Sequence, residues 1–583
     1  MHYQPCTAEM RFLLEQVLGA PAQLQGLAAF AEVDRDLMDQ VLQEAGKFVA
    51  EVVAPLNREG DETGCRISGG QVVTPPGFRT AYQAFWQAGW PALTSAPEDG
   101  GQGLPTLLES LLYEMLSGAN HGWTMAPGLL HGAYECLKHH GSAALQADYL
   151  PKLATGEWLA TMCLTEPHAG SDLGLVRTRA MPLPDGHYAL SGTKIFISGG
   201  DQDMSDNIVH LVLARLPDAP PGPKGLSLFL VPKFYPDGRR SAVHCDRIEE
   251  KMGLHGSPTC VLRFDAAAGW LIGEAGRGLN CMFVMMNAAR LHVALQGVGL
   301  LDAAWQKADA YARERRQMRV PGPRDSREPA DLISGHPAMR RILDTQRAWV
   351  DGGRVLAYQT AIELDMARHH PDPLRQAQAQ NWCSLLTPVL KAACTAQAFQ
   401  GASDCLQVFG GHGYVREWGI EQIVRDARVA MIYEGTNEIQ AIDLLVRKVL
   451  ADGGKSMNAL LDRLAADSAL SGAADGSPSA RFLLRVDSLR ALTATLAQAH
   501  TSHTSHASLA YAVADDYLRA TALLLLDWAW LQIDRALPPG EDTDSHARWR
   551  VPAQALRDWV LPEFDMRIGI IRTQCHGTAN QGG

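Results

Sequence analysis

The chain has 583 residues, of which 52 are Lys or Arg and 64 are Asp or Glu, so its formal net charge at pH 7 is −12. Hydrophobic residues make up 46% and charged residues 20%, a balance that is typical of a globular protein and excludes a disordered or collagen-like chain. A net acidic chain of this length predicts several domains and no overall attraction for nucleic acid or anionic lipid.

The cysteines and the N-terminal segment indicate a cytoplasmic protein. Eleven cysteines lie singly along the chain, with no C-x-x-C pair, which argues against a disulfide framework or a zinc cluster. Glu9, Arg11 and Glu15 stand where a signal peptide needs an apolar run, and Asp527 interrupts the most apolar stretch, 522–533. We therefore expect no membrane span. The repeated His500, His503 and His506 have no carboxylate or Cys neighbours that would complete a ligand set, so we expect no metal site.

Residues 12–162 have the periodicity of helices. An apolar face with steps of three or four residues predicts a helix over 34–53, which we expect Pro55 to end; it is formed by Leu37, Val41, Ala45, Phe48 and Val52. The segment 96–105 is rich in Gly and Pro and predicts a loop.

The pattern changes to strands near residue 161. A Pro-Asp-Gly turn within 181–192 predicts a hairpin, and the apolar runs 207–216 and 225–234 have the length and composition of strands. Helical periodicity returns at Leu279 as one very long helix to Arg315, followed by a loop over 320–337 and helices over 338–370, 378–408 and 440–451. Small residues predict a linker over 465–480 before a last helical region.

These patterns predict a mainly α protein with a central antiparallel β domain. We expect a helical domain over 1–160, the β domain over 161–275, a helical domain over 276–455 and a C-terminal helical extension over 465–583.

Two segments of the β domain carry residues that suit a flat, phosphorylated ligand. In MCLTEPHAGSDL (162–173), Thr165, Gly170 and Ser171 offer hydroxyls and accessible backbone N–H groups; an ordinary hydroxyl-rich turn is the alternative. In GTKIFISGG (192–200), strand alternation places Phe196 and Ser198 on one face, where a ring could stack on a heterocycle; the alternative is a half-buried strand.

Two further segments lie in the helical part. Four arginines within 310–319 crowd a helix end, which suits either a phosphate or a solvated basic face. In 406–440, Gly410 and Gly411 permit close backbone approach, and Glu434 follows the apolar run AMIY. A desolvated carboxylate has a raised pKa, as a general base for a weak carbon acid requires; a helix-end or ion-paired carboxylate is the alternative.

Five motifs together resemble the acyl-CoA dehydrogenase family: TEPHAGSD, KIFISGG, the Tyr311–Arg315 step, QVFGGHGY and IYEGTNEIQ. Their order and spacing match over residues 34–450. The stretch EEKMGLHGSPTCVLRF and the C-terminal extension are similar to a large bacterial subgroup that includes methylmercaptopropionyl-CoA dehydrogenase. The resemblance implies an N-terminal helical domain, a small β domain and a four-helix-bundle domain.

The resemblance also implies the site residues. FAD would be bound by Met162, Leu164, Thr165, Gly170, Ser171, Phe196, Ile197 and Ser198, and by Arg315, Gln317, Gln407, Gly410, Gly411, Thr436 and Glu438, with Gln407 to Gly411 coming from a second subunit. The acyl-CoA would be bound by Ser171, Asn287, Arg290, Tyr433 and Gly435. The chain departs from the family pattern where Phe196 and Ser198 stand for Trp and Thr, Glu438 for Gln, and Asn287 for Asp.

The implied reaction is α,β-dehydrogenation of an acyl-CoA thioester to the trans-enoyl-CoA. Glu434 would abstract the α-proton while flavin N5 takes the β-hydride, and an electron-transfer flavoprotein would re-oxidise the flavin of a homo-oligomer, a dimer or tetramer. Two alternatives remain open from the sequence: an acyl-CoA oxidase on the same fold, and a catalytically silent acyl-CoA-binding assembly protein.

Overall fold

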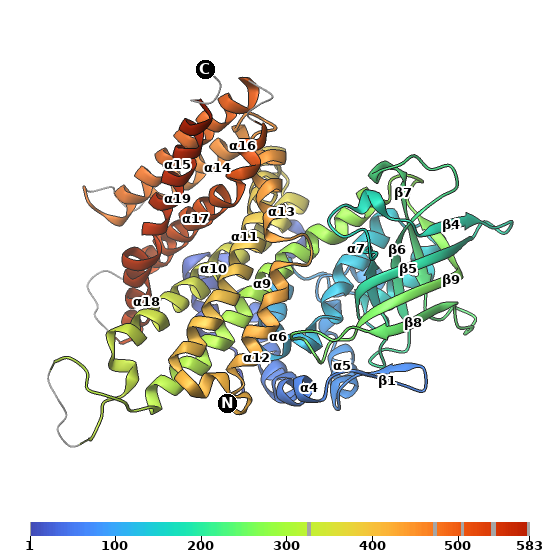
Figure 1. Cartoon of the computed structure of the whole chain (residues 1–583), viewed down its shortest axis with the longest axis horizontal. Helices are drawn as coiled ribbons and strands as arrows, with labels where there is room; N and C mark the ends of the chain where they lie inside the picture. The colour runs from blue at the N-terminus through green and yellow to red at the C-terminus, as the bar shows by residue number, and fades with distance from the viewer. Residues whose placement is uncertain (1, 323–327, 470–474, 503–506, 538–543, 580–583) are drawn as a thin grey trace. The chain divides into compact units, whose positions relative to one another are not determined.

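The computed structural model describes residues 2–322, 328–469, 475–502, 507–537 and 544–579 (Figure 1). The chain forms two compact units, and each is described by itself. The helical unit comprises residues 3–46 and 293–583, and the sheet unit comprises residues 47–292. The helix α9, Gly278–Glu314, begins in the sheet unit and ends in the helical unit.

Long helices form the centre of the helical unit. After α9, helices α10 (Pro337–His369) and α11 (Pro373–Val408) pack along each other, and α12 (Ile420–Arg428) and α13 (Asn437–Ile442) pack on α11 (Figure 1). The N-terminal helices of this unit are α1 (Thr7–Phe12), α2 (Ala20–Gln25) and α3 (Arg35–Phe48). Nearly every residue in the middle of α10 is buried, which explains why this helix shows no single apolar face.

The C-terminal extension folds against the same long helices. Its elements are α14 (Lys455–Ala469), α15 (Pro478–Ser502), α16 (Ala507–Ala512), α17 (Ala514–Ala536), α18 (Asp544–Ala555) and α19 (Pro562–Ala579). Helix α17 packs on α10, and the Trp530 indole N–H donates to the Ala348 carbonyl at 2.9 Å. Arg548 of α18 donates to the buried Asp351 carboxylate of α10 at 2.8 and 3.2 Å.

A mixed sheet forms the centre of the sheet unit. Its strands are β3 (Leu159–Cys163), β4 (Arg179–Pro182), β5 (Tyr188–Ser198), β6 (Ile208–Arg215), β7 (Leu226–Pro232), β8 (Val243–Ile248) and β9 (Thr259–Ile272). They are joined in the order β3-β6-β4-β5-β9-β7, with β8 on β9 and β6 also on β7. The preceding helices are α4 (Asn57–Thr63), α5 (Phe78–Gln87), α6 (Thr106–Thr124), α7 (Leu130–His140) and α8 (Ala143–Ala154), and a small hairpin is formed by β1 (Arg66–Ser68) and β2 (Gln71–Val73).

The predicted helices and strands are confirmed with three corrections. Residues 323–327 of the predicted loop 320–337 and residues 470–474 of the predicted linker 465–480 lie outside the described residues. The hairpin of β4 and β5 is antiparallel as expected, but β3 pairs with β6 in parallel, so the sheet is not purely antiparallel. The predicted linker 465–480 is wrong at both ends, because α14 continues to Ala469 and α15 begins at Pro478. Pro55 does not end helical structure: it opens a short 3₁₀ turn that leads into α4, since proline is tolerated at a first turn.

No helix in the described part of the chain is long and apolar enough to cross a membrane. Within the same ranges, no group of three or more His, Cys, Asp or Glu side chains could hold a metal ion. Of the three repeated histidines, His503 and His506 lie outside the described residues.

Candidate active site

In the sheet unit, the structure brings the two predicted flavin-binding segments together. The Ile195 N–H of β5 donates to the Thr165 carbonyl at 2.9 Å, just beyond the end of β3. The buried Lys194 ammonium donates to the Leu164 carbonyl at 3.0 Å and to Glu166 Oε1 at 2.9 Å. Met162, Leu164 and Thr165 therefore lie beside the strand that carries Phe196, Ile197 and Ser198.

Phe196 occupies an unusual backbone position. Its φ of +60° lies in the left-handed region, and its ring is 61% exposed although it belongs to a strand. A register shift between Lys194 and Ile197 causes this, so both of these residues are buried and the simple alternation predicted from the sequence is wrong. The bulge turns an aromatic ring outward, where it is available to stack on a planar ligand.

The remaining predicted residues of this unit lie in the turn after β3 and on α9. Gly170 and Ser171 are exposed, and a Cβ added at Gly170 would meet no atom within 4 Å, so the backbone there is open to a ligand. Arg290 is buried on α9 with 8% of its surface exposed. The side chain of Asn287 lies outside the described residues.

In the helical unit, an aromatic cluster joins the end of α9 to the glycine-rich segment after α11. The Tyr311 and Phe409 rings stack with centroids 4.3 Å apart, and the Tyr311 hydroxyl bonds His412 Nδ1 at 2.9 Å. Trp418 stacks on His412 at 4.9 Å. These contacts join the end of α9, four residues before Arg315, to the glycine-rich segment of the same chain.

Arg315 differs from the other arginines of its segment. Arg313 pairs with Asp309 at 2.6 Å, Arg319 with Asp331 at 3.2 Å, and Arg316 donates to the Ala330 carbonyl at 3.2 Å. Among the residues that the structure describes, the exposed Arg315 guanidinium has no such partner. It is therefore the arginine of this segment that is available for an anionic ligand. Gln317, Gln407, Gly410 and Gly411 are also exposed.

Glu434 lies in a tight turn between α12 and α13. Its φ is +54° and that of Gly435 is +85°, so two consecutive residues have left-handed backbone. This conformation is unfavourable for a residue with a side chain and costs about 1–3 kcal/mol, which neighbouring interactions must offset. A Cβ at Gly435 would lie 2.8 Å from Gln440 Nε2, which explains the glycine there.

Three neighbouring residues of the predicted site lie in this turn or at the start of α13. The Tyr433 hydroxyl donates to Gln296 Oε1 at 2.6 Å, and burial, with Glu434 nearby, raises the pKa of Tyr433. Thr436 caps α13 by accepting from the Ile439 N–H at 3.4 Å. Hydrogen bonding from Thr436 lowers the pKa of the exposed Glu438.

Sequence reasoning missed the side chains that hold these segments. Lys391 and Gln440 bind the carbonyls of the Glu434 turn, and Lys194 with Glu166 ties the β3 end to β5. A signal was present for the lysine on α11, because Lys391 is the single charge in the run TPVLKAAC. A charge in an apolar helical run predicts a buried, paired group.

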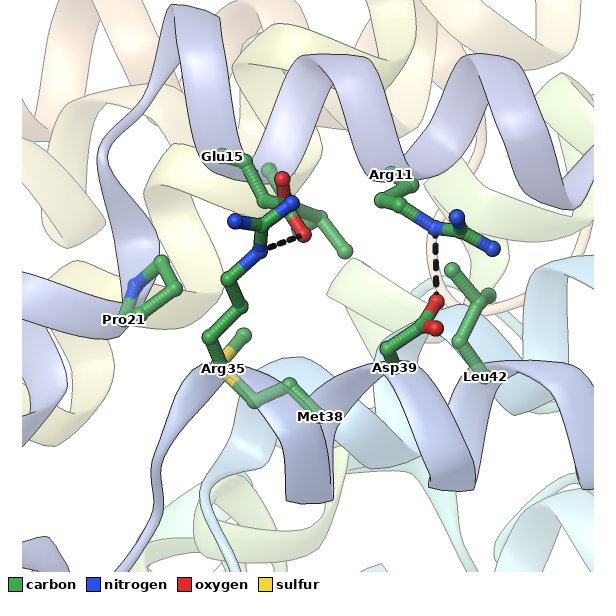
Figure 2. A pocket seen from close by; sticks show the side chains of 8 residues that line it. Arg11, Glu15, Pro21, Arg35, Met38, Asp39 and Leu42 are labelled. Atoms are coloured by element: carbon green, nitrogen blue, oxygen red, sulfur yellow. Dashed lines mark hydrogen bonds and ion pairs between the residues drawn. The ribbon is translucent and has the colours of Figure 1, made fainter.

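A small hollow in the helical unit contains none of the predicted site residues. It is lined by residues of α1, the π-helical segment Leu13–Val17 that continues it, α2 and α3. Figure 2 shows two ion pairs across it, Arg35 with Glu15 at 2.8 Å and Arg11 with Asp39 at 2.6 Å. Both arginines are partly exposed, so these pairs fasten the N-terminal helices at the surface.

Comparison with known proteins identifies the family. Residues 36–157, 161–267 and 276–449 match the family models of the N-terminal, middle and C-terminal domains of acyl-CoA dehydrogenase. The curated 3-methylmercaptopropionyl-CoA dehydrogenase of Ruegeria pomeroyi is 45% identical over 472 residues, which cover 80% of this chain and 79% of that protein.

Solved structures agree on the fold. ACDH-11 of Caenorhabditis elegans in complex with C11-CoA has a TM-score of 0.73 at 21% identity and covers 91% of this chain and 90% of its own. An acyl-CoA dehydrogenase of Bacillus anthracis complexed with FAD has a TM-score of 0.72 at 20% identity and covers 92% and 88%. The predicted fold class, helical with a central sheet and a C-terminal helical extension, is confirmed. The chain belongs to the acyl-CoA dehydrogenase family.

Proposed function

We propose that this protein is an FAD-dependent enzyme that removes two hydrogens from the α and β carbons of an acyl-CoA thioester and releases the trans-enoyl-CoA. The observation that supports this most strongly is the turn that carries Glu434, whose unfavourable backbone is held by partly buried hydrogen bonds to its carbonyls. Strained backbone that is retained in this way is concentrated at functional sites.

Glu434 is the proposed base. It accepts the α-proton on a carboxylate oxygen, which requires an ionised carboxylate at the moment of transfer and a fixed direction of approach. The left-handed turn supplies the fixed direction, since the Glu434 carbonyl is bound by Gln440 and the side chain of the preceding Tyr433 is held by Gln296. The apolar residues Ile432 and Tyr433 precede Glu434 in the sequence, and an apolar setting shifts the pKa of a carboxylate toward the value that a general base requires.

FAD is the proposed cofactor, and two features of the chain fit it. The outward Phe196 ring beside Thr165 and Ser198 suits the isoalloxazine, and the Arg315 guanidinium suits a phosphate. When bound, FAD supplies the acceptor for the β-hydride. The structure related to this chain and complexed with FAD supports the same choice.

We propose the same roles for the rest of the predicted site. The FAD is contacted by Met162 to Ser171, Phe196 to Ser198, Gln317, Thr436 and Glu438, and by Gln407 to Gly411 of a second subunit. The acyl-CoA is contacted by Ser171, Asn287, Arg290, Tyr433 and Gly435. We propose that the chain divides into four parts, with boundaries at 160, 275 and 455–465. We also propose that the protein is a cytoplasmic homo-oligomer and that an electron-transfer flavoprotein accepts its electrons. The 45% identical relative makes 3-methylmercaptopropionyl-CoA the first acyl-CoA to assay, beside straight chains of graded length.

The test is anaerobic reduction of the purified yellow protein by acyl-CoA. We expect Glu434→Gln to retain FAD but to lose flavin reduction by about 10²–10⁴-fold, because general-base catalysis contributes that factor. Glu421→Gln is the matched control: it neutralises a carboxylate of α12 that pairs with Arg425 at 2.6 Å, and it should reduce at the rate of the unmodified protein. Undiminished reduction by Glu434→Gln would show that another group is the base.

The same preparation separates the alternatives. A colourless protein, or one whose flavin no acyl-CoA bleaches, would favour the hypothesis of a catalytically silent acyl-CoA-binding assembly protein. Rapid return of colour in air with formation of peroxide would favour the oxidase. We expect the yellow colour to return slowly in air and quickly when electron-transfer flavoprotein is added.

A further inference from the structure

Lys391 of α11 is a fully buried lysine at the turn that carries Glu434. Its ammonium donates to the Gly435 carbonyl at 2.7 Å and to Asn437 Oδ1 at 3.0 Å. Both acceptors are neutral. Burying an ammonium is costly unless its protons are satisfied, so its placement against a backbone carbonyl indicates that the carbonyl's position matters.

The lysine belongs to a clamp between α11 and the turn. Asn437 Nδ2 donates to the Ala392 carbonyl at 3.1 Å, and the Thr395 hydroxyl lies 3.3 Å from Asn437 Oδ1. Lys391 and Thr395 lie one turn apart on the same face of α11, and Ala392 follows Lys391 directly. A rigid helix of 36 residues therefore holds the first residues after the turn.

Gln440 completes the clamp from the other side. Its amide Nε2 donates to the Glu434 carbonyl at 3.0 Å and to the Gly435 carbonyl at 3.3 Å. The carbonyls of both left-handed residues are thus bound, one of them by two side chains. If these donors are removed, the backbone of Glu434 can relax from φ +54° toward the ordinary helical or extended regions, which would swing its side chain.

We infer that Lys391 is a positioning residue for the base: it fixes the Gly435 carbonyl and, together with Gln440, holds Glu434 in the left-handed conformation from which it takes the proton. The inference rests on the proposed function, because it assigns Lys391 a role through Glu434. Charge-assisted hydrogen bonds are about twice as strong as neutral ones, which makes a lysine suited to offset the backbone strain of the turn.

The experiment compares three variants of the full-length protein as turnover per bound FAD. In Lys391→Met we expect turnover per bound FAD to fall by about 10–100-fold, since a displacement of about 1 Å at a reacting group has an effect of this size. We expect KM for the acyl-CoA to change by less than about threefold, because Lys391 is not itself a proposed acyl-CoA contact and bonds only the backbone carbonyl of one of them, Gly435. A purely structural role would lower the melting temperature or the FAD content and leave turnover per bound FAD unchanged.

Lys448→Met is the matched control. Lys448 also donates to a carbonyl of α11, that of Ser384 at 2.6 Å, but it holds the segment after α13 and does not bond the Glu434 turn. It should keep turnover per bound FAD within about twofold of the unmodified protein. An equal fall in Lys448→Met and Lys391→Met would overturn the inference, because anchoring α11 in general would then explain both.

Gln440→Met covers the case in which Lys391→Met does not fold. It removes the second donor to the same carbonyls without leaving a buried charge, and we expect turnover per bound FAD to fall by about tenfold. Normal turnover in folded Lys391→Met, or in Gln440→Met where the lysine variant does not fold, would refute the clamp. Failure of the proposed function is distinguished by Glu434→Gln: if that variant turns over normally, the base is misassigned and the clamp has no base to position.

Discussion

The Lys194 ammonium lies 2.9 Å from Glu166 Oε1 in the sheet unit, and both side chains are buried. Glu166 also accepts from the Thr178 hydroxyl at 2.6 Å and from the Thr178 and Arg177 N–H groups at 2.9 and 2.8 Å. Burial by itself would raise the pKa of Glu166, but Lys194 and these donors outweigh it and hold the pKa below its usual value. The pair fastens the segment after β3 to β5, where the proposed flavin contacts lie.

Removal of one member of this pair should be costly. We expect Lys194→Met to lower the free energy of unfolding by about 3–5 kcal/mol, because it leaves the buried Glu166 carboxylate without its lysine partner. Urea unfolding followed by circular dichroism measures this loss. Arg263→Met breaks the exposed Arg263–Asp246 pair between β9 and β8 and should cost at most about 1 kcal/mol. Equal losses in the two variants would contradict a special role for the buried pair.

Arg315 should contribute to retention of FAD. We expect Arg315→Ala to raise the dissociation constant of FAD by about 10–100-fold, the equivalent of one charged hydrogen bond. Arg313→Ala, which removes a guanidinium already paired with Asp309, is the control and should retain FAD as the unmodified protein does. The FAD that each variant releases on ultrafiltration is measured by its fluorescence. Equal retention of FAD in the two variants would rule out a contact between Arg315 and a phosphate of FAD.

His210 should make the sheet unit sensitive to acid. Burial, with a smaller effect of Lys233, lowers the pKa of this imidazole from 6.5 to about 3, and its Nδ1 lies 2.8 Å from the Thr161 hydroxyl. Above pH 6.5 the folded and unfolded chains are both neutral there. As the pH falls from 6.5 toward 3, only the unfolded chain binds the proton, so the free energy of unfolding decreases by about 1.4 kcal/mol per pH unit.

His210→Gln should remove this contribution. We expect its free energy of unfolding, measured with urea at pH 7, 6 and 5, to fall less steeply than that of the unmodified protein. Part of the slope remains, because burial also lowers the pKa of His121, to about 4. His244→Gln removes an exposed imidazole on β8 of the same sheet and should leave the slope unchanged. A slope in His210→Gln as steep as in the control would mean that this buried imidazole is not the source.

Gly352 should be required for docking of the C-terminal extension on α10. A Cβ at this position would lie 2.3 Å from Leu526 Cδ1 and 3.1 Å from Trp530 Nε1, and the indole is held by its bond to Ala348. We expect Gly352→Ala to lower the melting temperature, with an overpacking cost of about 1–3 kcal/mol. A Cβ at Gly569 on α19 meets no atom within 4 Å. Gly569→Ala should therefore raise the melting temperature, because the better helix propensity of alanine adds up to about 1 kcal/mol to the free energy of unfolding. A stabilised Gly352→Ala would show that α17 can shift without loss.

Local patterns determined most of the fold. The predicted helices over 338–370 and 378–408 are confirmed as α10 and α11 within a few residues, because helical periodicity and flanking proline are encoded locally. The hairpin of β4 and β5 followed from its turn chemistry. The parallel pairing of β3 with β6 could not be predicted, since it joins strands more than 40 residues apart and depends on the arrangement of the whole sheet.

The candidate site divides in the same way. The sequence by itself determined which residue types carry the chemistry: Glu434 after an apolar run, Phe196 among hydroxyl groups, and Arg315 at a helix end. Only the tertiary structure decided how they are held. The bulge that turns Phe196 outward, the Asp331 carboxylate that pairs with Arg319, and the Lys391 clamp on the Glu434 turn depend on partners at least twelve residues away in sequence. The pair of Arg313 with Asp309 is local, because the two residues are four positions apart on α9. A sequence motif gives the identity of a side chain. The direction of that side chain depends on its backbone conformation, and where this conformation is strained, long-range hydrogen bonds must stabilise it.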